Sequence, residues 1–77
     1  MPRFFLNVRR HGTLIRDEEG DELPGGAAAE GLARDILCDM RRLPHIYGPP
    51  RVWRADTFVI TDEAGAAVAE VPFACIL

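Results

Sequence analysis

The stretch that decides the fold runs from Ala27 to Leu43 and reads AAAEGLARDILCDMRRL. Its apolar residues recur every three or four positions, which is the spacing of one face of an α-helix. Arg41 and Arg42 fall in the last turn, where positive charge suits the negative end of the helix dipole. Pro44 follows and marks the end. The pattern therefore predicts one amphipathic helix over this stretch.

Extended segments precede the predicted helix. Residues 3–9 read RFFLNVR, and their even positions are all apolar, as in a strand with one buried face. A turn at residues 10–12 leads to a second strand over 13–16, which we expect to pair back as a hairpin. A third, very short strand is predicted at residues 21–23.

The chain after the helix is predicted to form a loop and a second hairpin. Residues 45–51 contain a Gly-Pro-Pro run and are expected to form a stiff loop. Strands are predicted over residues 52–61 and 66–76. Pro72 places the second of these at a sheet edge or at a bulge.

Two four-residue segments share the pattern D-E-x-G. Residues 17–20 and 62–65 place Asp first and Gly fourth, which favours a type I turn. Carboxylates also bind cations, but Ca²⁺ takes about six to eight oxygen ligands, and neither segment has the spaced acids of an EF-hand loop. We interpret both segments as hairpin turns.

The order β-β-(short β)-α-β-β predicts a single α+β domain over residues 1–77. In this two-layer fold, an antiparallel sheet built from two hairpins is packed on one face by a single helix. The other face of the sheet is left for solvent, a ligand or a partner.

The composition excludes several kinds of chemistry. The chain has 9 basic and 12 acidic residues, for a net charge of −3. Every base is arginine, and serine and lysine are absent, so there is no serine nucleophile, Schiff-base lysine or phosphate-loop lysine. The acidic balance also lacks the field that attracts nucleic acids.

The distribution of apolar residues bears on the compartment. No apolar run approaches the roughly 20 residues of a membrane span, and no apolar leader precedes the first predicted strand. Two cysteines in such a chain are typical of free thiols in a reducing compartment. We therefore expect a cytoplasmic protein that does not contact a membrane.

Several short motifs together resemble a family of very short bacterial proteins that is known as a domain of unknown function. They are the M-P-R-F-F start, the two D-E-x-G turns, Trp53 and the C-terminal pair Pro72-Phe73. The resemblance covers nearly the whole chain and departs from the family between Pro44 and Pro50, where a plainer linker is expected. It implies the same fold and brings no activity or catalytic residue. A likeness to small antitoxin domains rests on element order alone.

Cys38 is the first candidate for chemistry. It lies opposite the apolar stripe of the predicted helix, among arginines that favour a thiolate and aspartates that oppose it. A catalytic cysteine also needs a base, and only His11 and His45 are available. We expect an exposed surface thiol.

Cys75 follows the alternation of the last strand into the core, which argues against a disulfide between Cys38 and Cys75. The scattered spacing of these four residues also argues against zinc.

A candidate interaction surface lies on the outer face of the sheet. Arginine beside an aromatic ring on an open sheet can stack nucleic-acid bases, whereas exposed apolar patches usually mark protein interfaces. The net acidity favours protein. The predicted surface comprises Arg3, Phe5, Asn7, Arg9, Trp53 and Val59, with Thr61 at its margin.

These features predict a small protein-interaction or homo-oligomeric module without catalytic activity, cofactor or metal. A second copy of the chain or another protein is the expected partner, because so short a chain buries little surface on its own. One alternative is a nucleic-acid-binding or antitoxin-like regulatory domain that uses Arg3, Phe5 and Arg9. Another is a thiol-based redox protein that uses Cys38.

Overall fold

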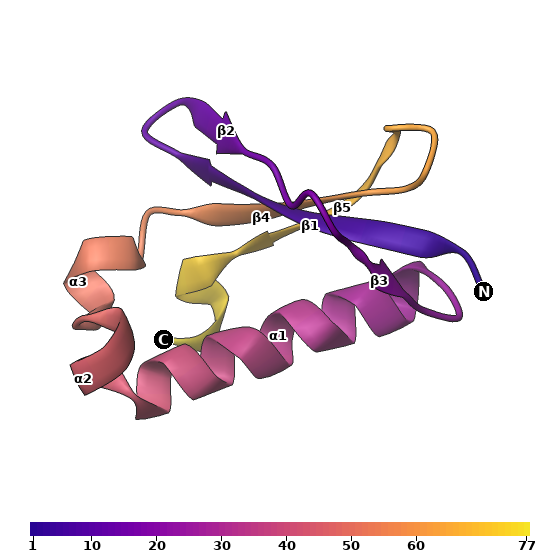
Figure 1. Ribbon diagram of the computed structural model, residues 1–77. Helices are drawn as coiled ribbons and strands as arrows, with labels where there is room; N and C mark the ends of the chain where they lie inside the picture. The colour runs from indigo at the N-terminus through magenta and orange to yellow at the C-terminus, as the bar shows by residue number, and fades with distance from the viewer.

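A five-stranded antiparallel sheet carries one long helix on one face (Figure 1). The computed structural model describes residues 1–77. The strand order is β2-β1-β4-β5, and β3 also pairs with β1. The predicted α+β class is confirmed. The strands are β1 (Arg3–Arg10), β2 (Thr13–Ile15), β3 (Asp21–Glu22), β4 (Thr57–Thr61) and β5 (Ala67–Pro72).

The predicted helix is confirmed. Helix α1 runs over Gly26–Arg42, so each end lies within one residue of the prediction. Its fully buried residues are Ala29, Ala33 and Leu37, one turn apart. The two alanines let the helix backbone lie close to the sheet, while Leu37 fills the space near the last turn. Neither α1 nor any shorter helix is long and apolar enough to cross a bilayer.

The core lies between α1 and the inner face of the sheet. The even positions of β1 point inward, as the alternation predicts. The rings of Phe58 and Phe73 pack in a tilted arrangement with centroids 4.5 Å apart, and the Trp53 ring centroid lies 6.1 Å from that of Phe73. The buried strand residues of this core are Phe4, Leu6, Phe58, Ile60 and Val71.

The β1–β2 hairpin is also confirmed. Its two turn residues, His11 and Gly12, both have positive φ angles, 51° and 77°. Two positive φ angles define a type I′ turn, whose twist matches that of antiparallel strands. The register then pairs Val8 with Ile15.

The two D-E-x-G segments form tight turns with different roles. In the second, the Gly65 N–H donates to the Asp62 carbonyl at 3.0 Å, and the turn joins β4 to β5 as predicted. In the first, Asp17 Oδ1 accepts from the N–H groups of Glu19 and Gly20. This turn joins β2 to β3, and both strands pair with β1. The prediction of a hairpin here was wrong.

The segment after α1 differs most from the prediction. In place of a loop and the start of a strand, it forms two short helices, α2 (Pro44–Tyr47) and α3 (Pro50–Trp53), and β4 begins only at Thr57. Proline is the first residue of each helix, where its missing N–H and fixed φ are well tolerated. The helical turn of α3 directs Trp53 into the core, with the indole N–H donating to the Gly48 carbonyl at 3.3 Å.

The last strand is shorter than predicted. β5 ends at Pro72, and Phe73–Ile76 form a 3₁₀-helix, η1. The Phe73 N–H donates to the Asp56 carbonyl, which lies outside the β4–β5 ladder. Because the alternation stops there, Cys75 is exposed, and its predicted place in the core was wrong.

Candidate interaction surfaces

The outer face of the sheet brings together part of the predicted surface. The register pairs Phe5 with Thr61 and Asn7 with Val59, so these residues lie on the face opposite α1. Trp53 does not belong to this group. It is 1% exposed and lies in the core on the other side of the sheet, so its assignment to the surface was wrong.

Asn7 lies on the outer face but is buried. Its side-chain amide donates to the Val59 carbonyl at 2.9 Å and to Thr61 Oγ1 at 3.1 Å. Its side-chain oxygen accepts from the Asp17 N–H at 3.1 Å. These bonds tie β1, β4 and the β2–β3 turn together. The predicted role of Asn7 as a contact residue was therefore wrong, and its role is structural.

The two arginines of the outer face are engaged within the molecule. Arg3 contacts Glu22 at 3.1 Å and donates to the Glu19 carbonyl at 2.7 Å. Arg9 reaches across β4 to Glu70 at 2.6 Å. Val59, which pairs with Glu70 in the sheet, is itself buried. This face therefore offers a partner little uncompensated positive charge.

The Arg9–Glu70 pair supplies a titration test. The hydrogen bond from Arg9, with its charge, lowers the pKa of Glu70 below the usual 4.5, and the same contact raises the pKa of Arg9. Folding lowers the pKa of Glu70, so the ion pair stabilises the folded protein at any pH above the usual pKa. This stabilisation is lost as the pH falls through the lowered pKa of the folded state.

We expect an Arg9→Ala substitution to return the pKa of Glu70 toward 4.5. Carboxyl ¹³C NMR across an acid titration measures it directly. A Glu70 pKa that is the same in both proteins would show that the ion pair does not form in solution.

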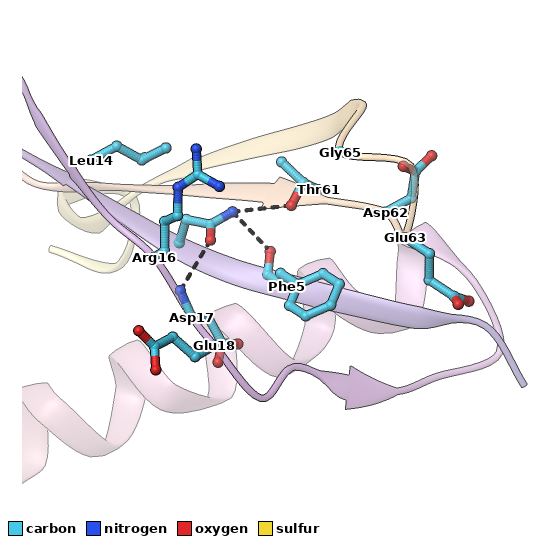
Figure 2. Close-up of a pocket in the computed structure, with 10 residues that line it drawn as sticks. Phe5, Leu14, Arg16, Asp17, Glu18, Thr61, Asp62, Glu63 and Gly65 are labelled. Carbon is cyan, nitrogen blue, oxygen red and sulfur yellow. Dashed lines mark hydrogen bonds between the residues drawn. The ribbon is translucent and has the colours of Figure 1, made fainter.

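A depression of about 440 Å³ lies on the outer face between β1 and the two D-E-x-G turns. Figure 2 shows Asp17 and Glu18 on one side of Phe5, with Asp62 and Glu63 on the other. Arg16 is the one basic residue at its rim. The lining therefore carries four acids and one base, with apolar surface from residues such as Phe5 and Leu14.

Most of these carboxylates already have partners. Asp17 and Asp62 accept N–H groups of their own turns, and Glu63 Oε1 accepts the Arg3 N–H at 3.0 Å. The side chain of Glu18 makes no such bond. No group of three or more His, Cys, Asp or Glu residues is arranged to hold a metal ion. The depression thus reflects the construction of the two turns.

The β2–β3 turn lies tightly against β1. Gly20 has a φ of 69°, and a Cβ atom there would lie 2.8 Å from the Phe4 carbonyl oxygen. Only glycine permits both the left-handed backbone and this close approach. The turn therefore holds the acids of residues 17–22 at the edge of β1.

A second surface, which sequence reasoning missed, lies at the corner formed by α2 and α3. Ile46 and Val52 are 63% and 59% exposed, and Tyr47 is also exposed. A Cβ atom at Gly48, the residue that follows α2, would lie 3.8 Å from Val52 Cγ2, so Val52 of α3 lies against the end of α2. The basic corner is defined as these three apolar residues with their basic neighbours Arg41, Arg42, His45, Arg51 and Arg54.

The charge at the basic corner is unbalanced. Residues 40–55 hold four of the nine arginines and no acid, so this segment carries +4 and the rest of the chain −7. Arg51 and Arg54 form no ion pair, whereas Arg42 pairs with Asp39 and Arg41 donates to the Ile76 carbonyl. In Figure 1, α2 and α3 lie at one end of the molecule, while β3 and the β4–β5 turn lie at the other. The signal was visible in the sequence as a long segment without acids.

The thiols and imidazoles lie apart from any catalytic arrangement. Cys38 is exposed on α1, as predicted, and Cys75 is exposed on η1, and both are free. His11 and His45 are exposed in the β1–β2 turn and on α2. Neither histidine is hydrogen-bonded to a cysteine. The structure therefore brings no general base to Cys38.

Comparison with known proteins adds one finding. The model of a family described as a domain of unknown function (DUF6894) matches residues 3–74, nearly the whole chain. No curated protein and no solved structure matches the chain.

Proposed function

Since the chain belongs to this family of domains of unknown function, which brings no activity with it, we propose that the protein is a non-catalytic interaction module. Its basic corner binds an acidic segment of a protein, one that also presents apolar side chains. The observation that carries this proposal is that Ile46, Tyr47 and Val52 are exposed on two consecutive short helices, beside the unpaired Arg51 and Arg54.

The chemistry of the basic corner suits a protein partner. Interfaces are enriched in tyrosine and arginine, and apolar side chains supply the area that is removed from water. Tyr47, Arg51 and Arg54 are of these types and are free to contact a partner. Charge on Arg51 and Arg54 would steer an acidic segment, while Ile46 and Val52 would bury its apolar residues.

Nucleic acid is the weaker candidate. Arg3 and Arg9, which would have stacked or paired with a polyanion on the sheet, are held by Glu22 and Glu70. Phosphate contacts make no use of exposed Ile46 and Val52. The −7 charge on the rest of the chain would also repel a polyanion that extends beyond the basic corner.

The compartment belongs to the same proposal. Cys38 and Cys75 are exposed and free, which suits a reducing environment. We therefore propose that binding takes place in the cytoplasm.

Fluorescence anisotropy with three labelled probes tests the proposal. The first is a short peptide of alternating leucine and glutamate, the second replaces each leucine by serine at equal charge, and the third is a short thymidine oligonucleotide. We expect the leucine peptide to bind at low salt and the serine peptide to bind about tenfold more weakly, because charge alone contributes little to affinity at exposed sites.

The matched variant removes the net charge of the basic corner, because two Arg→Glu substitutions lower the +4 of residues 40–55 to zero. Arg51→Glu with Arg54→Glu is expected to weaken binding of the leucine peptide by about tenfold or more. Both side chains are exposed and unpaired, so the fold, checked by circular dichroism, should be unaffected. Stronger binding of the oligonucleotide than of the leucine peptide would contradict the proposal, as would equal peptide binding by the variant.

A further inference from the structure

We infer that the acidic, apolar segment is supplied by a second copy of this chain. In this arrangement the basic corner of one molecule docks on the acidic edge of another. The acidic edge is defined as exposed Leu14 and Ile15 of β2 with the acids of residues 17–22. This inference rests on the proposed function of the basic corner and names its partner.

The acidic edge has the chemistry that the proposal requires of a partner. β2 is the outermost strand on its side of the sheet, and all three of its residues are exposed. Leu14 and Ile15 are followed by five acids between residues 17 and 22. The side chains of Glu18 and Glu19 make no hydrogen bond or ion pair, so their charges are free.

The two surfaces complement each other. Apart from the terminal residues and Val68, every large apolar side chain that is exposed belongs either to the basic corner or to the acidic edge. Arg51 and Arg54 beside one apolar group are unpaired, and so are Glu18 and Glu19 after the other. A contact on the outer face would bury Leu14 and bring opposite charges together, which also disfavours the like-charged alternatives, whereas Ile15 points to the other face of β2.

The size of the molecule is compatible with such a contact. A stable interface buries about 800 Å² on each partner, which is a modest share of the 4928 Å² surface of one molecule. A contact between two different surfaces of one chain is made twice when two copies are related by a two-fold axis. A chain this small would gain the buried surface that it lacks alone.

A charge exchange tests the inference on the full chain. The corner variant carries Arg51→Glu and Arg54→Glu, and the edge variant carries Glu18→Arg and Glu19→Arg. Sedimentation equilibrium of the wild type should show a mass that rises with concentration from 8.5 kDa toward twice that value. Each variant alone should associate at least about tenfold more weakly, because one of its two surfaces has lost nearly all of its net charge.

The mixture of the two variants is the decisive sample. In the mixture, the intact +4 corner of the edge variant can face the intact acidic edge of the corner variant, a contact that neither variant can make with itself. Association should therefore return in the mixture and weaken with added salt, as expected for exposed charges. Circular dichroism of each variant should match that of the wild type, since the exchanged side chains are exposed and unpaired.

Failure of this inference is distinguishable from failure of the proposed function. A wild type that stays monomeric, or a mixture in which association does not return, would overturn self-recognition. If the leucine peptide still binds the basic corner, the proposed function stands with a different protein as partner. If neither the peptide nor a second copy binds, both are wrong.

Discussion

Replacing Trp53 with alanine is expected to destabilise the protein by about 3–5 kcal/mol, the range seen when large aromatic residues are removed from cores. Trp53 is 1% exposed, packs near Phe73 and donates its indole N–H to Gly48. The substitution would leave a large cavity between α3 and the sheet. For so small a domain, this loss is a large share of the total stability, so the urea concentration at the unfolding midpoint should fall sharply.

Urea unfolding followed by circular dichroism is the appropriate measurement, because Trp53 is the only tryptophan and its fluorescence is lost with it. Val52→Ala is the matched control. Val52 is the preceding residue in the same helix and is exposed, so its replacement should change stability by no more than about 0.5 kcal/mol. Equal stability of Trp53→Ala and the wild type would show that α3 does not turn Trp53 inward.

The second large effect is expected at the ion pair between Arg10 and Asp56. Asp56 is 3% exposed, and its Oδ2 accepts from Nε and Nη2 of Arg10 at 2.8 and 2.6 Å, which raises the pKa of Arg10. Asp56→Ala should cost about 2–3 kcal/mol, the worth of hydrogen bonds to charged groups. Arg10→Ala should cost more, because it leaves a buried carboxylate without a partner, whereas water can reach the half-exposed Arg10.

Thermal unfolding of both single variants and of the double variant measures this asymmetry. Glu70→Ala is the control, because the Arg9–Glu70 pair has the same 2.6 Å separation but is exposed on both sides. We expect its effect to be too small to resolve. If Arg10→Ala proves milder than Asp56→Ala, the carboxylate is not buried in solution.

The parts of the fold that follow a simple period could be predicted. The helical spacing of Ala29, Ala33 and Leu37 and the alternation of β1 both reflect burial on one face, and they were correct. The prediction for residues 44–56 was wrong because proline was interpreted as a residue that forms loops. Pro44 and Pro50 in fact begin helices, a position that proline favours. The exposed Cys75 shows the same limit, because alternation cannot reveal where a strand gives way to a 3₁₀-helix.

The candidate site was predicted only in part. The outer face was located correctly, but its arginines are held by Glu22 and Glu70, which lie 19 and 61 residues away in the chain. Such ion pairs depend on strand order, which sequence spacing does not contain. The basic corner needed knowledge of α2 and α3 before Ile46 and Val52 could be placed on two consecutive short helices, although the acid-free segment around them was visible from the start.

An NMR titration tests the central claim most directly. ¹⁵N-labelled protein is titrated with the leucine–glutamate peptide, and the amide shifts report where it binds. Binding at the basic corner predicts that the largest changes fall on α2 and α3, at Ile46, Tyr47, Val52 and the arginines beside them. Changes confined to the outer sheet face around Phe5 and Thr61, or no saturable changes at all, would contradict it.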